Sequence, residues 1–262
     1  MNKRRIILRA ITESIALARP FYVPRPGLRI LMYHSIGQRA YNDEKGIFSI
    51  TQQHFQSHIQ SLAEIHDIQK VPLQPLNIPT SKLQVAITFD DGYLDNLKIA
   101  APILIKHQIP FTVFACSDFI RNSVCGFMTP GDLKELSRLS GVTIGSHGKT
   151  HRKLTECDDI ELGRELYDSK CYLEDLLGQP IISLSYPYGA ANMRIRNAAL
   201  HYGYNTGLST YFNINAVGRD PLMLNRCNVE RDDDNRVFHQ KLSGCWDWFR
   251  WRSTDPVKLM SE

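Results

Sequence analysis

The sequence QVAITFDDGYLDNLKIAAPILIKH, residues 84–107, joins a strand pattern to a helix pattern through two adjacent carboxylates. Its first part, Gln84–Phe89, is a short run of mostly apolar and β-branched residues, which is typical of a buried strand. A helix pattern occupies residues 93–107. Asp90 and Asp91 therefore lie where a predicted strand ends and its helix begins.

The same alternation of strand and helix patterns continues along the 262-residue chain beyond residue 28. Strands that alternate with helices favour a parallel sheet covered on both faces. Seven predicted strands in a chain of this length favour a βα barrel, with an open doubly wound sheet as the alternative. The predicted strands are Leu28–Tyr33, Gln84–Phe89, Pro110–Cys116, Val142–Gly145, Ile181–Tyr186, Asn205–Ser209 and Leu222–Asn225, and the predicted helices lie near Gln53–Ile65, Tyr93–His107, Gly131–Leu139, Glu156–Leu177 and Asn192–Tyr202.

The composition excludes several classes of protein. Hydrophobic residues at 43% and charged residues at 22% are ordinary globular values, which excludes global disorder. No apolar run approaches the roughly 18 residues that a membrane-spanning helix needs. The six cysteines show no paired spacing and the N-terminus does not read as a secretory signal, so we expect reduced thiols in a cytoplasmic protein.

Positive charge is concentrated at the N-terminus. Residues 1–29 contain seven Lys or Arg and one acid, a net charge of +6, so the rest of the +4 chain carries −2. This distribution argues against a nucleic-acid-binding surface. Ile7, Ile11 and Ile15 recur at helical spacing, so residues 1–27 are predicted to contain a basic amphipathic helix. It would either contact an anionic membrane or pack against the domain.

The sequence divides into three predicted regions. The N-terminal arm 1–27 precedes a single domain, residues 28–245, and residues 246–262 form a Trp- and Arg-rich tail. The tail contains all three tryptophans of the chain. It is predicted either to pack on the barrel as a cap or to form a patch that meets a membrane interface or a sugar. No motif specifies an oligomeric state.

The adjacent carboxylates Asp90 and Asp91 are the first candidate site. In a βα barrel the active site is built from residues that directly follow the strands. Two neighbouring carboxylates are costly unless a positive charge lies beside them. A metal ion would satisfy this requirement, with one carboxylate binding the ion and the other accepting a proton from water. The alternative is an ordinary helix start with Asp as its N-cap.

Two histidines form the second candidate site. His147 and His151, in Ser146–His151, follow the predicted strand Val142–Gly145 and can share a divalent ion through imidazole nitrogens. Together with Asp91 they would supply three protein ligands and leave an open position, as a hydrolytic metal site requires. Surface or hydrogen-bonded structural histidines are the alternative.

A rigid turn forms the third candidate site. Pro187 and Gly189 flank Tyr188 just after the predicted strand Ile181–Tyr186. Such a turn at a strand end can direct a backbone N–H into the site and stabilise an oxyanion there. A plain β-turn is the alternative.

These motifs resemble a known family. TFDDGY at 88–93, SHGKTH at 146–151 and YPYG at 186–189 resemble the polysaccharide deacetylases with the NodB homology domain. LMYH at 31–34 is similar to the start of that domain in its exopolysaccharide-type members. The resemblance covers about residues 28–209. It implies a distorted (β/α)7 barrel and metal-dependent removal of N-acetyl groups from amino sugars.

The resemblance also implies roles for individual residues. Asp90 corresponds to the catalytic base of the family. Asp91, His147 and His151 correspond to the residues that hold one divalent metal, usually zinc.

Two positions depart from the family pattern. Many members have Arg, which pairs with the base, where this chain has Ser185. The last motif is often Leu-x-His and supplies the general acid, whereas residues 224–226 read Leu-Asn-Arg. We therefore expect Arg226 to take over the orientation of Asp90. His34 is the candidate general acid, because it follows the first predicted strand.

The predicted function is metal-dependent de-N-acetylation of a polysaccharide or lipid-linked glycan at the cytoplasmic face of the membrane. One alternative is a hydrolase of the same fold that acts on another non-peptide C–N bond, such as an N-formyl group. A second alternative is a catalytically silent carbohydrate-binding barrel. The intact Asp-Asp-His-His set argues against silence, because a binding module needs no adjacent carboxylate pair.

Overall fold

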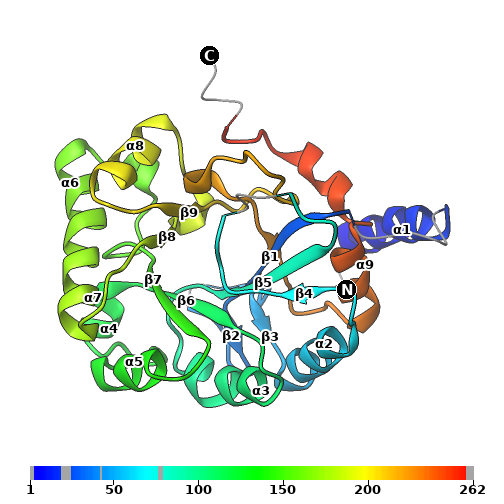
Figure 1. The fold of residues 1–262 in the computed structure, drawn as a ribbon, viewed down its shortest axis with the longest axis horizontal. Coiled ribbons are helices and arrows are strands. Elements are labelled where there is room, and N and C mark those ends of the chain that lie inside the picture. The colour runs from blue at the N-terminus through cyan, green and yellow to red at the C-terminus, as the bar shows by residue number, and fades with distance from the viewer. Residues whose placement is uncertain (1–2, 19–24, 42, 76–78, 258–262) are drawn as a thin grey trace.

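The computed structural model describes residues 3–18, 25–41, 43–75 and 79–257. Its main sheet is parallel and has the order β10-β1-β5-β6-β7-β8-β9, with β4 beside β5. The sheet curls, and helices surround it on the outside (Figure 1). This arrangement confirms the predicted distorted βα barrel in a single domain. Its strands are β1 (Gly27–Tyr33), β4 (Gln69–Lys70), β5 (Leu83–Phe89), β6 (Phe111–Ala115), β7 (Val142–Ser146), β8 (Ser183–Ser185), β9 (Thr206–Leu208) and β10 (Cys227–Asn228), and β2 (Ser35–Ile36) pairs separately with β3 (Ser49–Ile50).

Most of the helices occupy the crossovers between the strands. Capping residues explain where two of them begin. The side chain of Thr51 accepts a hydrogen bond from the backbone N–H of His54 in α2, and Thr129 and Asp132 form a capping box at the start of α5. The α-helices are α1 (Lys3–Ala18), α2 (Gln52–Glu64), α3 (Ala101–Lys106), α4 (Ser117–Arg121), α5 (Pro130–Ser137), α6 (Asp159–Gly163), α7 (Ser169–Leu177), α8 (Met193–His201) and α9 (Asn235–Ser243). The other helical segments are the π-helical turns η1 (Asn96–Ala100) and η3 (Arg164–Asp168) and the 3₁₀ turns η2 (Leu154–Glu156), η4 (Pro187–Gly189), η5 (Pro221–Met223) and η6 (Asp247–Arg252).

The core lies between the sheet and its helices. Strands β1 and β5 pair in register from Gly27 opposite Leu83 to Tyr33 opposite Phe89. Every residue of β1 is buried, as expected for a strand covered on both faces. The two strands therefore end together, at the same edge of the sheet.

One predicted strand is wrong. Residues 222–225 were expected to be extended, but Pro221–Met223 form the 3₁₀ turn η5, and the strand of this region is β10, which starts at Cys227. Pro221 has no N–H to donate to a strand ladder. The carboxylate of Asp220 accepts a hydrogen bond from the backbone of Leu222 at 2.9 Å and stabilises the turn.

Helix α1 packs on the barrel through one face and leaves an apolar face exposed. Thr12 is buried and accepts a hydrogen bond from Nε1 of Trp248 at 3.2 Å. Glu13 accepts one from Gln240 of α9 at 3.0 Å. Ile7 and Ile11, by contrast, are 60% and 41% exposed. In the predicted arm, residues 1–2 and 19–24 and the side chains of residues 3–5 and 18 lie outside the described residues.

The first part of the Trp- and Arg-rich tail packs on the barrel. Trp246 and Asp247 are buried, and Asp247 forms a bidentate ion pair with the buried Arg29 of β1 at 2.9 and 3.2 Å. Trp251 is 77% exposed. Within the described part of the chain, no helix is long and apolar enough to cross a membrane.

Candidate active site

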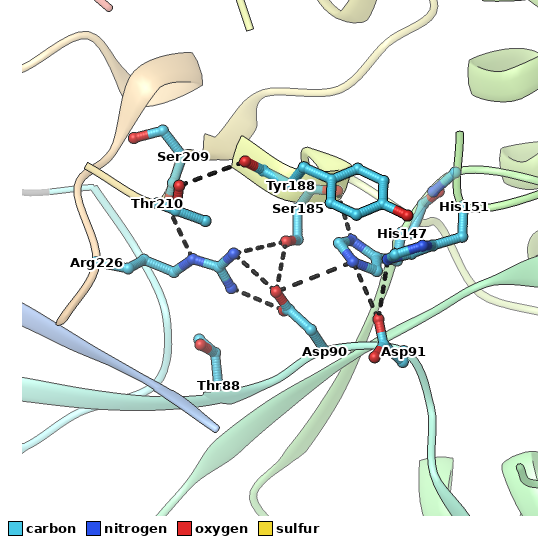
Figure 2. Close-up of polar contacts among 12 residues, drawn as sticks. Thr88, Asp90, Asp91, His147, His151, Ser185, Tyr188, Ser209, Thr210 and Arg226 are labelled. Carbon is cyan, nitrogen blue, oxygen red and sulfur yellow. Dashed lines mark hydrogen bonds and ion pairs between the residues drawn. The ribbon is translucent and has the colours of Figure 1, made fainter. Parts of the chain in front are cut away.

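The candidate site lies at the carboxyl ends of the parallel strands. Asp90 and Asp91 directly follow β5, and His147 directly follows β7. Ser185 is the last residue of β8, and Arg226 directly precedes β10 (Figure 2). The common direction of β5, β7 and β8 therefore gathers the carboxylates, His147 and Ser185 at one edge, as the barrel architecture predicts, and the long side chain of Arg226 reaches Asp90 from the start of β10.

Asp91, His147 and His151 come together as a candidate metal centre. Oδ1 of Asp91 lies 3.3 Å from Nε2 of His147 and 3.3 Å from Nε2 of His151. One potential ligand atom from each residue lies within 4.8 Å of the other two. Asp91 and His151 have positive φ angles of 75° and 62°, which non-glycine residues rarely adopt outside functional sites. Gly92, at φ 83°, continues the sharp turn into the helix.

The unpaired atoms of this cluster fit a divalent cation. Oδ1 of Asp91 is buried and has no hydrogen-bond partner among the described residues. The carbonyl oxygen of Ser185 lies 2.7 Å from Nδ1 of His147. When Nδ1–H donates to that carbonyl, the lone pair of Nε2 faces the cluster, as in zinc-binding histidines. One carboxylate and two imidazoles are a donor set that suits zinc.

The electrostatics of the cluster also favour positive charge. Burial by itself lowers the pKa of His147, but the carboxylates of Asp90 and Asp91 outweigh burial, and the pKa is raised. Burial raises the pKa of Asp91, but the close approach of His147 and His151 outweighs it, and that pKa lies well below the usual range. A cation between these groups would relieve the same imbalance.

Asp90 is held by Arg226. The guanidinium donates to both carboxylate oxygens at 2.7 and 2.8 Å, and both side chains are buried. Ser185 links the two: its hydroxyl donates to Asp90 at 3.1 Å and accepts from Arg226 at 2.9 Å. Arg226 also donates to the carbonyl of Ser209 at 3.0 Å. Burial raises the pKa of Asp90, but the charges and hydrogen bonds of Arg226 and His147 outweigh it, so the pKa is lowered.

A cavity of about 510 Å³ opens over these residues. His34 lines it and packs against the ring of Phe48 at 4.6 Å. Nδ1 of His34 is buried without a hydrogen-bond partner among the described residues. Burial lowers the pKa of His34 and outweighs the opposing effect of Asp91 and Asp90.

The turn at 187–189 places one of its residues in the cavity wall. Tyr188 lines the cavity at φ 58°, and its ring lies 4.8 Å from that of His151. Pro187 is buried, and Gly189, at φ 67°, approaches Thr210 too closely for any Cβ. These two residues shape the turn, whereas the described lining of the cavity includes neither of them.

Sequence reasoning missed part of the site. It treated Ser185 only as a departure from a family pattern, whereas its hydroxyl bridges Asp90 and Arg226. It also gave the tail no place in the cavity, although Phe249 and Arg252 line it. The Arg-rich composition of the tail was a signal for a functional role, but not for this location.

Comparisons with known proteins agree with the motifs and the fold. The sequence profile described as polysaccharide deacetylase matches residues 77–207. A protein of Bacillus subtilis (strain 168) named as a polysaccharide deacetylase, YxkH, is 31% identical over 192 residues, which are 70% of this chain and 64% of that protein. The chain therefore matches slightly less than two thirds of the length of this relative.

Two solved structures share the fold. The Streptococcus pyogenes deacetylase PplD, in complex with acetate, superposes with a TM-score of 0.71 at 24% identity, covering 84% of this chain and 99% of its own. IcaB from Ammonifex degensii gives a TM-score of 0.70 at 20% identity, covering 86% of this chain and 99% of its own. The profile match covers half of the sequence and includes Asp90, Asp91, His147 and His151. The chain belongs to the polysaccharide deacetylase family.

Proposed function

We propose that this protein is a metal-dependent hydrolase that removes N-acetyl groups from the amino sugars of a polysaccharide or lipid-linked glycan. The observation that carries the proposal is the buried Oδ1 of Asp91, which lies 3.3 Å from an imidazole nitrogen of both His147 and His151. A second carboxylate, Asp90, lies beside this cluster, with Oδ2 4.0 Å from Nε2 of His147. Metal ligands beside a carboxylate that can accept a proton are what metal-assisted hydrolysis requires.

Asp90 is proposed as the general base. When bound at Asp91, His147 and His151, a divalent ion such as Zn²⁺ supplies positive charge that activates water and polarises the acetamide carbonyl. Asp90 accepts the proton of the attacking water, because Arg226 keeps its carboxylate ionised. Arg226 is thus a positioning residue.

His34 and the turn at Tyr188 are proposed to complete the reaction. His34 lines the cavity on the β1 side and would donate the proton that releases the amine. The backbone N–H of Tyr188 would stabilise the negative charge that develops on the acetamide carbonyl oxygen when water attacks. Replacing His34 with Gln should lower kcat, because the amide cannot deliver a proton.

We further propose that the protein works at the cytoplasmic face of a membrane. The exposed Ile7 and Ile11 and the net charge of +5 in residues 1–27, which leaves out the buried Arg29, support this location. Apolar side chains that enter the interface and basic side chains near anionic lipid are the two components of peripheral binding.

Acetate release from a panel of N-acetylated glycans tests the proposed activity. The wild-type enzyme should release acetate and leave a product lighter by one acetyl group, and Asp90→Asn should not. Asp67→Asn, which alters a fully exposed carboxylate outside the cavity lining, is the matched control and should retain activity. Release of formate from N-formyl sugars, with N-acetyl sugars unchanged, would establish the alternative hydrolase. Binding without turnover of either class would establish a silent barrel.

A further inference from the structure

The C-terminal segment forms one wall of the cavity that contains Asp90 and Asp91. Phe249, Arg252 and Ser253 line the cavity together with these carboxylates. They belong to the turn η6 and the residue after it, which lie far beyond the last strand of the barrel in sequence. A tail that lines a catalytic cavity is placed to contact the substrate.

Two ion pairs fix this wall to the barrel. On one side, Asp247 pairs with the buried Arg29 of β1. On the other side, Asp255 accepts two hydrogen bonds from Arg219 at 2.7 and 2.8 Å. Both pairs are bidentate, and such pairs restrict orientation as well as distance. The segment between them is therefore held in place, and its side chains are pre-positioned.

An aromatic platform supports the arginine of the wall. The ring of Phe249 packs edge-on against Phe212 at 5.6 Å and against Trp248 at 5.8 Å. The guanidinium carbon of Arg252 lies 4.4 Å from the centroid of Phe249, a cation–π contact. The Phe249 platform thus holds a positive charge at the mouth of the cavity.

Arg252 is the sole Lys or Arg among the described residues that line the cavity. No carboxylate among the described residues forms an ion pair with it. Of the acidic residues in the lining, Asp43 already accepts a hydrogen bond from the backbone of Phe48, and Asp90 is paired with Arg226. The guanidinium of Arg252 therefore has hydrogen-bond donors available for a ligand.

We propose that Arg252 binds an anionic group, a phosphate or a carboxylate, that the glycan carries close to the acetamido sugar. The planar guanidinium fork matches both of these anions. The proposal rests on the proposed deacetylase function for the identity of the sugar, but the anion contact itself does not need catalysis. Arg252 would then determine which glycans are accepted.

Matched substrates test this inference. The kcat/KM for acetate release is measured for N-acetylglucosamine 1-phosphate, for a disaccharide of N-acetylglucosamine and glucuronic acid, and for the neutral N,N′-diacetylchitobiose. The wild-type enzyme should prefer at least one charged substrate over the neutral one by about tenfold or more, as a charge-assisted contact implies. The two charged arms distinguish phosphate from carboxylate. In Arg252→Gln the ratio of charged to neutral kcat/KM should fall toward one, and Arg252→Lys should recover part of it.

Arg250→Gln is the matched control, because Arg250 lies on the same turn but does not line the cavity. This variant should keep the wild-type ratio. Equal kcat/KM for charged and neutral substrates in the wild-type enzyme, or an unchanged preference in Arg252→Gln, would overturn the inference.

A binding measurement separates this inference from the proposed function. Calorimetry with glucose 1-phosphate, methyl glucuronide and methyl glucoside, which carry no acetyl group, requires no turnover. Tighter binding of either charged sugar that is lost in Arg252→Gln and kept in Arg250→Gln would support the anion site, even if no N-acetyl sugar is hydrolysed. Equal binding of the three sugars would overturn the anion site, even if hydrolysis is observed.

Discussion

Arg226 donates two hydrogen bonds, of 2.7 and 2.8 Å, to the carboxylate of Asp90, which lies 136 positions earlier in the chain. This pair joins the residue that precedes β10 to the residue that follows β5. It also occupies both oxygens of Asp90 on one side, which fixes the plane of the carboxylate. The hydroxyl of Ser185, where many relatives are expected to have arginine, completes the arrangement.

Replacing Arg226 tests its positioning role. Arg226→Ala should lower kcat by at least tenfold with less effect on KM, because Asp90 loses its orientation and its charge partner. It should also destabilise the protein by about 3–5 kcal/mol, because a buried carboxylate is left unpaired. Arg226→Lys, or guanidinium added to the alanine variant, should restore part of kcat. A folded alanine variant with wild-type kcat would remove Arg226 from the mechanism.

The metal centre makes a separate prediction. His147→Ala and His151→Ala should each reduce the metal content of the purified protein, because each removes one of three protein ligands. Elemental analysis of the wild type should show close to one divalent ion per chain. His54→Ala, which removes a half-buried histidine outside the cavity lining, is the control and should keep that content. Undiminished metal in the triple Asp91/His147/His151 alanine variant would refute the assignment.

His58 predicts a pH dependence of stability. Its ring is buried and stacked on Phe238 at 4.3 Å, and burial lowers its pKa from the usual 6.5 to about 4. The unfolded chain therefore takes up a proton before the folded chain does. The free energy of unfolding should fall by up to about 3 kcal/mol as the pH decreases from 6.5 to 4, and this contribution should level off below pH 4.

The variant His58→Gln should lose this part of the pH dependence, because its side chain has no proton to gain. Its amide can still donate to the carbonyl of Asp233, which lies 2.8 Å from Nε2 of His58. Urea unfolding at several pH values measures the effect, with the exposed His66→Gln as control. Parallel curves for wild type and His58→Gln would show that His58 does not cause the decline.

The exposed face of α1 predicts binding to anionic vesicles. The full-length protein should sediment with liposomes that contain phosphatidylserine and dissociate at high salt, since each basic residue near the surface contributes about 1 kcal/mol that salt screens. Ile7→Ser combined with Ile11→Ser should weaken this binding without disturbing the packed face at Thr12. Ile160→Ser, which alters an isoleucine that is 68% exposed on α6, is the control. Equal sedimentation of the double variant and wild type would contradict membrane contact through this face.

The part of the site that could be predicted from the sequence consists of residues at strand ends. Asp90 directly follows the predicted strand Gln84–Phe89, and His147 lies just after the predicted strand Val142–Gly145. A parallel sheet brings the ends of both strands to one edge. The contact of Arg226 with Asp90 was expected only from the family pattern. Residues 222–225 have no reliable hydrophobic period, and the strand predicted there is a 3₁₀ turn. The position of Arg252 was not predictable, since it depends on the pair of Arg29 and Asp247, which are 218 residues apart. Such long-range pairs leave no periodic signal in the sequence.

The most direct test of the account is to measure metal content and acetate release together in the Asp90→Asn variant. Its three ligand residues are intact, so the account predicts close to one divalent ion per chain, as in the wild type. Turnover should fall by about 10²–10⁴-fold, because the amide cannot accept the proton of water. Wild-type turnover in this variant, with the metal retained, would contradict the assignment of Asp90 as the base.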